Sequence, residues 1–457
     1  MTDREATRSR LNTIAITLIN SSAGLILFLF LLGSCQLPHS GMPGSPVPEP
    51  KAVDTRGERK PPLPELRAVD ALGEQKTIVI LVELPKFRNR FSRQEVHRRV
   101  FEELNDYIKE VSYGKTWLTG DMTKKWYVLP DRSVDAVTNS QKNWFSGDLV
   151  AYLRPLVELI SDAISLADRD IDFSKYRHSV VVIGLSPPAK WYAFGGGAMC
   201  GPLAGLEFRT PSGQSVRGSS LATAGAHLGM FAHEFIHQLG GYEEGVYFPR
   251  MRARNLARYR RVAGDLYDLK AYMTRGNWHG LTQYYAKYIG PWDLMGFHTV
   301  DPNRPPAGPS SFTKLRLGWI AEPQVAIVKP GDFLKLKLNP LELPTSGTQV
   351  VKIPLTPNTY YLLEHRQQVG CDSVLPSSGV LIYYVDETIK EAQGILKLVD
   401  AHPNIPEFRG APFDIGPKRN DTFVDKENGW ILRLIEKHAG SYTIEIDATK
   451  LGFSNRP

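Results

Sequence analysis

A nine-residue segment near the middle of the 457-residue chain constrains its fold more than any other. Residues 232–240 read Ala-His-Glu-Phe-Ile-His-Gln-Leu-Gly. On a helix, His233 and His237 are four residues apart and therefore lie on one face, one turn from each other. Two neutral imidazoles at that spacing can reach one zinc ion, and Glu234 beside them can take a proton from a water. Only 11 residues of the chain are histidine, so a chance pair around a glutamate is the weaker explanation.

The flanks of this motif predict a buried helix with a sharp end. Residues 225–231 are mostly small or apolar, and the pair Gly240-Gly241 ends the helix or bends the chain. Such a bend lets a third ligand return to the same metal. Glu243 stands ten residues after His233 and is one candidate for that ligand. The alternative is that Glu243 is a loop carboxylate facing solvent.

The composition is that of an ordinary globular protein, with 42% hydrophobic and 23% charged residues. The net charge of +7 is mild for this length and is spread along the chain, which argues against nucleic acid as a partner. The three cysteines, Cys35, Cys200 and Cys371, form no Cys-x-x-Cys pair, which argues against a thiolate zinc site or a redox pair. Cys200 and Cys371 could form a disulfide in an exported protein or remain two buried thiols.

Residues 1–35 have the layout of an export signal. Three arginines precede an apolar stretch over residues 14–32, and the stretch ends in Leu-Gly-Ser-Cys. This ending resembles a bacterial lipobox, so we predict lipid anchoring through Cys35 at the cell envelope. An uncleaved membrane anchor and a simple secretory signal are the alternatives. Residues 36–73 are rich in proline and charge, which predicts an extended tether.

The next part of the chain alternates predicted strands and helices. Residues 76–84 and 179–184 are continuous apolar runs, typical of central strands buried on both faces. Apolar residues at helical spacing predict one helix over 92–111, with Ser92 as its N-cap, and another over 149–167. This alternation ahead of the His233 helix favours an α/β subdomain that backs a metal site.

The residues after the motif differ in character. Residues 250–261 carry six arginines. A solvated helical face is the simpler interpretation, and a contact to an acidic substrate or to lipid headgroups is the alternative. Residues 290–296 place Met295 in a tight turn, and a thioether there can form an apolar floor under zinc ligands. Over residues 321–457, short β-like runs alternate with Pro/Gly turns, which predicts a mainly antiparallel β region.

These segments resemble the immune inhibitor A type of secreted bacterial zinc metallopeptidase. The resemblance covers most of residues 76–450. It is carried by residues 78–84, 110–115, 231–240, 265–268, 290–295, 314–319, 361–367 and 379–383. It implies an α+β fold, with a zincin- or metzincin-like catalytic domain over residues 74–320 that combines a central zinc helix and a mixed sheet. It also implies zinc-dependent endopeptidase activity outside the cell, with structural calcium as a further cofactor.

The chain departs from this family after the zinc helix. In the family the helix runs straight into a Pro-Asp-Leu-Tyr-Asp segment, whose first Asp is the third zinc ligand. Here the matching Asp-Leu-Tyr-Asp begins at Asp265, after an insertion that contains the arginine run. Resemblance favours Asp265 as the third ligand, while spacing keeps Glu243 close behind, and either carboxylate suits zinc.

The predicted reaction is hydrolysis of peptide bonds in extracellular or envelope proteins by a zinc-activated water, with Glu234 as general base. Tyr242, Tyr267 and His298 are weak candidates for stabilising the oxyanion. The expected partners are protein or peptide substrates and a membrane reached through the N-terminal anchor. The competing hypothesis is an inactive, surface-anchored binding or structural protein that keeps the metallopeptidase fold. The displaced third ligand favours this alternative, and the intact Glu234 argues against it.

Overall fold

Strand β1 (Gly73–Glu83) is the centre of the first sheet, and its residues Ile78 to Val82 are fully buried. It pairs in parallel with β2 (Thr116–Met122), β3 (Tyr127–Val128) and β4 (His178–Ile183). The sheet has the order β2-β1-β4-β8-β5, in which β8 (Ser219–Thr223) is parallel to β4 and β5 (Ala198–Met199) is antiparallel to β8. The predicted strands 76–84 and 179–184 are confirmed as β1 and β4.

The computed structural model describes residues 71–85, 87–134, 149–185, 198–199, 207–217, 219–241, 289–296, 304–389, 394–405 and 408–451. Several sequence predictions lie outside these ranges, namely the export signal over 1–35, all but the last residues of the tether over 36–73, and the arginine run over 250–261. No helix of the described residues has the length and apolar character needed to cross a membrane.

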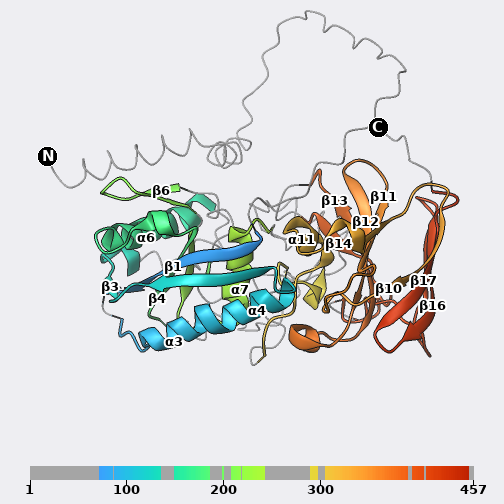
Figure 1. The fold of residues 1–457 in the computed structure, drawn as a ribbon, viewed down its shortest axis with the longest axis horizontal. Coiled ribbons are helices and arrows are strands. Elements are labelled where there is room, and N and C mark those ends of the chain that lie inside the picture. Colours follow the sequence, from blue (N-terminus) through green and yellow to red (C-terminus); the bar gives the residue numbers. More distant parts are fainter. Residues whose placement is uncertain are drawn as a thin grey trace, which may run out of the picture. The chain divides into compact units, whose positions relative to one another are not determined.

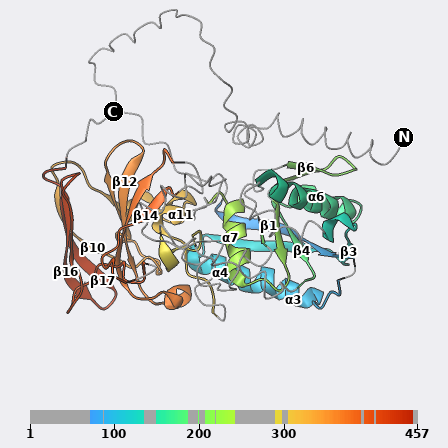
Figure 2. The same ribbon diagram turned by 180° about the vertical axis from the view of Figure 1, so that it is seen from behind.

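Helices cover both faces of the first sheet. The segment from α3 (Arg93–His97) through a π-helical stretch (Arg98–Leu104) to α4 (Asn105–Val111) is one continuous helix. It begins with a capping box between Ser92 and Glu95, so the predicted helix and its N-cap are confirmed. Helix α6 (Leu149–Ala167) has the predicted bounds and lies on the opposite side of the sheet from α4 (Figures 1 and 2).

Strand β8 was not predicted, although it leads directly into the helix that carries the His-Glu-x-x-His motif. Its sequence, Ser-Ser-Leu-Ala-Thr, is too polar to stand out as a buried strand. Its five residues are nevertheless all buried, and the Ser219 hydroxyl is hydrogen bonded to the Ser179 hydroxyl on β4. A short hairpin of β6 (Glu207–Arg209) and β7 (Ser215–Arg217) precedes it.

The C-terminal region contains two further sheets. One has the order β14 (Leu396–Leu398), β13 (Gly379–Asp386), β12 (Thr359–Arg366), β11 (Val350–Pro354) and β9 (Val325–Ile327). The other has the order β10 (Phe333–Leu338), β17 (Ser441–Asp447), β16 (Trp430–His438) and β15 (Thr422–Asp425). All pairs are antiparallel except β9 with β11, which confirms the predicted mainly antiparallel region.

Shorter helical elements lie between the strands. Helix α11 (Ser311–Arg316) begins at the N-cap Ser310. Single helical turns occupy Phe173–Lys175, Gly290–Trp292, Glu322–Gln324 and Gly370–Val374. The hydrophobic core extends beyond position 320, because Cys371 belongs to the same buried cluster as Trp319, β1 and the motif helix. The described chain is therefore a mixed α/β structure with several sheets and few helices.

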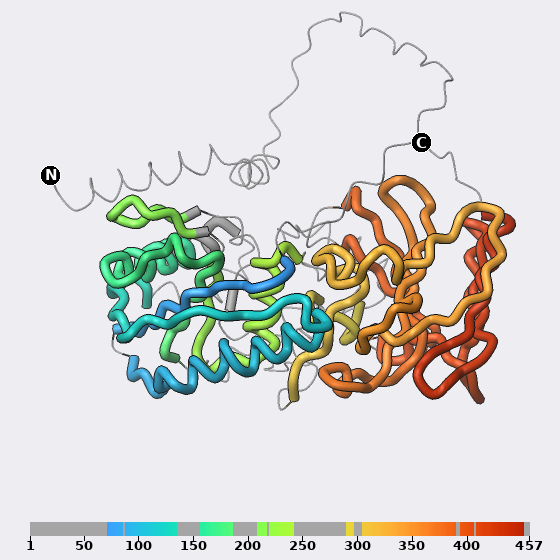
Figure 3. The backbone as a smooth tube through the Cα atoms, in the orientation of Figure 1, coloured from blue at the N-terminus to red at the C-terminus, as the bar shows by residue number. Residues whose placement is uncertain are grey.

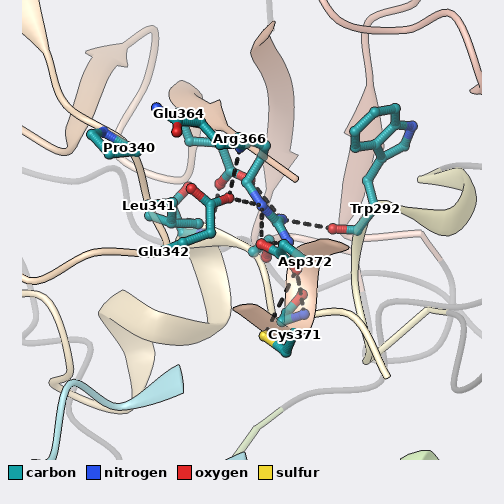
Figure 4. A network of polar contacts seen from close by, with 12 residues as sticks. Trp292, Pro340, Leu341, Glu342, Glu364, Arg366, Cys371 and Asp372 are labelled. Atoms are coloured by element: carbon teal, nitrogen blue, oxygen red, sulfur yellow. Dashed lines mark hydrogen bonds and ion pairs between the residues drawn. The ribbon is translucent and has the colours of Figure 1, made fainter. Parts of the chain in front are cut away.

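A buried ionic network holds the C-terminal region to the segment around residue 308 (Figure 4). Arg366 on β12 is fully buried, and its guanidinium contacts the carboxylates of Asp372 at 2.6 Å, Glu364 at 3.1 Å and Glu342 at 3.2 Å. It also donates hydrogen bonds to the carbonyl oxygens of Trp292 and Gly308, at 2.8 and 3.1 Å. One side chain thus ties β12 to two separate loops.

The three carboxylates around this guanidinium have pKa values that shift in different directions. Burial would raise the pKa of Asp372, but the charge of Arg366 together with hydrogen bonds from Glu342, the Gly308 N–H and Arg366 outweighs burial and lowers that pKa below its usual value. Burial raises the pKa of Glu342 well above its usual value, and the charge of Asp372 raises it further. Burial raises the pKa of Glu364 as well, but less than that of Glu342, so Glu342 is the carboxylate that we expect to stay protonated.

The substitution Glu342→Gln tests this assignment, because glutamine copies the size and the neutral charge of protonated glutamate. A group whose pKa is raised by folding stabilises the protein below its unfolded pKa and loses that contribution as pH rises through the folded pKa. Glutamine does not titrate, so the variant does not lose this stabilising contribution as the pH rises. We expect the stability of the variant relative to wild type, measured as the free energy of unfolding by urea denaturation, to increase as the pH rises above the usual glutamate pKa of 4.5. A pH-independent difference would contradict the assignment.

Candidate metal centre

Helix α7 (Leu228–Gln238) carries the His-Glu-x-x-His motif, and every residue from Leu228 to His237 is buried. The helix begins at His227, whose Nδ1 accepts a hydrogen bond from the Gly229 backbone N–H at 3.0 Å. The Nε2 of His227 then carries the proton and donates to the carbonyl oxygen of Arg304 at 2.9 Å. This cap replaces the usual Ser, Thr, Asp or Asn.

The helix ends in a tight glycine turn, as the sequence predicts. The N–H of Gly241 donates to the carbonyl oxygen of Ile236 at 2.9 Å, and the N–H of Gly240 donates to that of His237 at 3.0 Å. This pair of hydrogen bonds is a Schellman motif, and it requires the φ of +101° that Gly240 adopts. Gly241 has no room for a side chain, because a Cβ there would lie 2.4 Å from Ile236 Cγ2.

The two motif histidines face each other across one helical turn. The distance between His233 Nε2 and His237 Nε2 is 3.0 Å, and the rings are nearly perpendicular at 84°. Their other nitrogens contact backbone carbonyls: His233 Nδ1 lies 3.1 Å from the oxygen of Leu294, and His237 Nδ1 lies 2.9 Å from that of Gly241. Only 2% of His233 and 4% of His237 is exposed, so both contacts are shielded from water.

These contacts determine the tautomers of both imidazoles. A carbonyl oxygen can only accept a hydrogen bond, so each Nδ1 must carry a hydrogen, and each neutral ring then has its lone pair on Nε2. Two lone pairs at 3.0 Å repel each other unless a cation or a proton lies at this point. Zinc–nitrogen bonds of about 2.0–2.1 Å at a tetrahedral angle place two ligand nitrogens about 3.3 Å apart. The pair therefore fits a zinc ion that binds both Nε2 atoms.

Glu234 completes the described cluster. Its side chain is 7% exposed, and one oxygen lies within 4.8 Å of the ligand nitrogens of both histidines. Burying a carboxylate costs free energy unless hydrogen bonds or a nearby cation compensate for the lost hydration. Among the described residues, His233, Glu234 and His237 form the single group of three or more His, Cys, Asp or Glu side chains whose ligand atoms all lie within 4.8 Å of one another. No second group marks a calcium site there.

The turn over residues 293–296 supplies the Leu294 carbonyl and is itself fully buried. Asp293 organises this turn, because its Oδ1 accepts the Met295 N–H at 2.7 Å and its Oδ2 accepts the Ser310 N–H at 2.6 Å. Met295 is buried in the same cluster as the apolar side chains of α7. This turn contacts His233 through the Leu294 backbone carbonyl, so a role for the Met295 thioether remains a prediction.

The structure brings together three of the predicted site residues, His233, Glu234 and His237. The remaining predictions lie outside the described residues: the third-ligand candidates Glu243 and Asp265, the oxyanion candidates Tyr242, Tyr267 and His298, the lipidation site Cys35, and Cys200. Cys371 is described and is a buried free thiol in this structure rather than half of a disulfide.

Sequence reasoning missed the groups that orient the histidines. Two of them, the carbonyls of Leu294 and Gly241, are backbone atoms and have no side-chain signature. Asp293 had a usable signal, since an Asp two residues before the end of a buried turn commonly accepts backbone N–H groups. Searches with this chain found no matching protein-family model and no matching curated protein.

The substitution Gly241→Ala tests the glycine turn. The added Cβ would meet Ile236 Cγ2, so the turn must shift and move the carbonyl that accepts from His237. We expect a loss of about 1–3 kcal/mol in unfolding free energy, measured by chemical denaturation. Gly440→Ala is the matched control, because a Cβ there would make only an ordinary contact with Gln367 at 3.6 Å. Equal effects of the two substitutions would contradict this account.

Proposed function

We propose that this chain is a zinc-dependent endopeptidase of the immune inhibitor A type that hydrolyses extracellular or envelope proteins. The observation that carries the proposal is the pairing of His233 and His237. Their Nε2 atoms lie 3.0 Å apart, while both Nδ1 atoms face backbone carbonyls. Two lone pairs that face each other at this distance need a cation or a proton between them, and a bound metal supplies that cation. The zincin-like fold and the family assignment belong to this same proposal.

The residues of the chain have separate roles in this reaction. His233 and His237 would hold the zinc through Nε2, and the carbonyls of Leu294 and Gly241 keep the rings in the required tautomer. When bound, zinc supplies Lewis acidity that lowers the pKa of a water and polarises a carbonyl group. Glu234 accepts a proton from the attacking water at its carboxylate and donates it to the departing amine.

The third ligand in this proposal is Asp265 or Glu243, and calcium is a possible further cofactor implied by the family resemblance alone. A site of this class needs three protein ligands, and either carboxylate satisfies the chemistry. The Gly240-Gly241 turn supports a reversal of the chain after the helix, because its left-handed glycine sends the backbone away from the helix axis. Both candidates follow that turn.

The proposed location is the outer face of a bacterial envelope, with lipid attached to Cys35. The support for it is the N-terminal sequence, with its charged start, apolar stretch and cysteine. Substrates reach such an anchored enzyme as folded or unfolded proteins outside the cell. The inactive, surface-anchored binding protein is the alternative that the following experiment separates from the peptidase.

The substitution Glu234→Gln separates metal binding from turnover. Glutamine keeps the size of the buried side chain but cannot take the proton, so we expect wild-type zinc content with casein cleavage reduced about 10²–10⁴-fold. His233→Ala is the companion variant and should lose both zinc and cleavage. Zinc in the wild type and in Glu234→Gln without cleavage by either would favour the inactive binding protein over the peptidase.

The third ligand can be assigned by a pair of alanine variants. Asp265→Ala should release zinc if the family resemblance gives the correct ligand, whereas Glu243→Ala should then leave zinc content unchanged. Zinc content is measured by elemental analysis after dialysis against a weak chelator. Retention of zinc in Asp265→Ala together with its loss in Glu243→Ala would reverse the assignment.

A further inference from the structure

Helix α11 touches both of the turns that orient the candidate metal ligands. At its N-terminal end, the Ser310 N–H donates to Asp293 Oδ2 at 2.6 Å. At its C-terminal end, Arg316 Nε donates to the carbonyl oxygen of Gly240 at 2.6 Å. A helix of this length spans about 9 Å, so its two ends can contact different turns. In Figure 3 the gold segment that includes α11 lies beside the yellow-green segment of α7.

Each contacted turn serves one histidine. Asp293 shapes the turn whose Leu294 carbonyl accepts from His233. Gly240 precedes Gly241, whose carbonyl accepts from His237. The orientation of each imidazole therefore depends on a backbone oxygen that α11 holds in place from outside the motif.

The N-terminal end of α11 is itself anchored by buried carboxylates of the C-terminal region. The Ser311 N–H donates to Glu364 Oε2 at 2.6 Å, and the Gly308 N–H donates to Asp372 Oδ1 at 2.7 Å. Both carboxylates contact Arg366, which is fully buried. Hydrogen bonds between ionised carboxylates and backbone N–H groups are among the stronger ones in proteins. The start of α11 is thus fixed to strand β12.

We propose that α11 is the positioning element of the candidate metal centre. The two positioning residues are Asp293, which contacts the start of this helix, and Arg316, which is its last residue. Asp293 acts on the metal through Leu294 and His233, and Arg316 acts through Gly240, Gly241 and His237. The C-terminal β region, which anchors the start of α11, then helps to set the geometry of the metal site. This inference rests on the proposed metal-binding function of the histidine pair.

Physical chemistry gives these contacts a direct effect on affinity. Ligand side chains must be held within about 0.5 Å of the binding geometry, and loss of an orienting partner typically weakens metal binding about 10–100-fold. Asp293→Asn replaces one of two carboxylate acceptors by an amide N–H that faces a backbone N–H. Arg316→Gln removes the guanidinium that holds the Gly240 carbonyl. Each variant should loosen one turn and leave the other in place.

The experiment uses the full chain with its native residues and measures two properties of each variant. The first is the affinity for Zn²⁺, measured by competition with a chromophoric chelator, with Co²⁺ absorption as a check on coordination geometry. The second is the tautomer and exchange rate of each motif imidazole in the metal-free protein, measured by ¹⁵N–¹H spectroscopy on histidine-labelled chain. We expect an affinity loss of about tenfold or more for both variants.

The two variants should differ in which histidine they affect. Arg316→Gln should remove the protected Nδ1–H of His237 and leave that of His233, and Asp293→Asn should do the reverse. Arg316→Lys restores a donor and should recover part of the affinity. Lys314→Met is the matched control on the same helix, because the buried Lys314 contacts Tyr113 and the Leu341 carbonyl but neither turn.

Several outcomes decide the inference. It is overturned if Arg316→Gln keeps wild-type Zn²⁺ affinity and a protected His237 Nδ1–H, or if Lys314→Met also weakens Zn²⁺ binding and removes the protected His237 Nδ1–H. Because Asp293 is fully buried and Arg316 only partly, Arg316→Gln decides alone if Asp293→Asn does not fold. A wild-type chain that binds neither Zn²⁺ nor Co²⁺ would remove the proposed function instead, and the imidazole signals of the metal-free variants would still test the role of α11.

Discussion

The backbone carbonyls of Leu294 and Gly241 hold the two imidazoles of α7 through one hydrogen bond each, and the chemistry of the centre follows from these bonds. A buried imidazole without a fixed acceptor on Nδ1 could carry its hydrogen on either nitrogen. With the acceptor in place, the lone pair is fixed on Nε2 and points at its neighbour. Both acceptors are backbone atoms, so their positions depend on how two separate turns are packed rather than on a single side chain.

The packing of those turns relies on buried carboxylates that accept backbone N–H groups. Asp293, Glu364 and Asp372 each accept one N–H from the segment over residues 308–311. Loss of such an acceptor would leave a buried donor unsatisfied, at a cost of about 1–3 kcal/mol. Arg366 compensates two of the three carboxylates. Breaking a buried ion pair of this kind typically costs about 3–5 kcal/mol, so the network holds the loops in a single arrangement.

The elements that the sequence predicted well share a strong local pattern. Strand β1 is a continuous apolar run, and the helix over 92–111 has both regular apolar spacing and a Ser-x-x-Glu capping box. Strand β8 was missed because its serines are buried only after β4 supplies partners for them. Helix α11 was missed for a similar reason, since six residues are too few to display a helical period.

The sequence by itself determined which side chains can bind a metal, because helical periodicity places His233 and His237 on one face and puts Glu234 beside them. It also determined the sharp end of α7, since only glycine adopts the required backbone conformation at Gly240 without strain. Only the tertiary structure decided how the imidazoles are oriented. The carbonyl that orients His233 belongs to Leu294, 61 residues away in the chain. The carbonyl that orients His237 belongs to nearby Gly241, but the turn that contains it is held by Arg316, which is 76 residues from Gly240. Contacts over such separations arise from packing, and no local pattern of residue types encodes them.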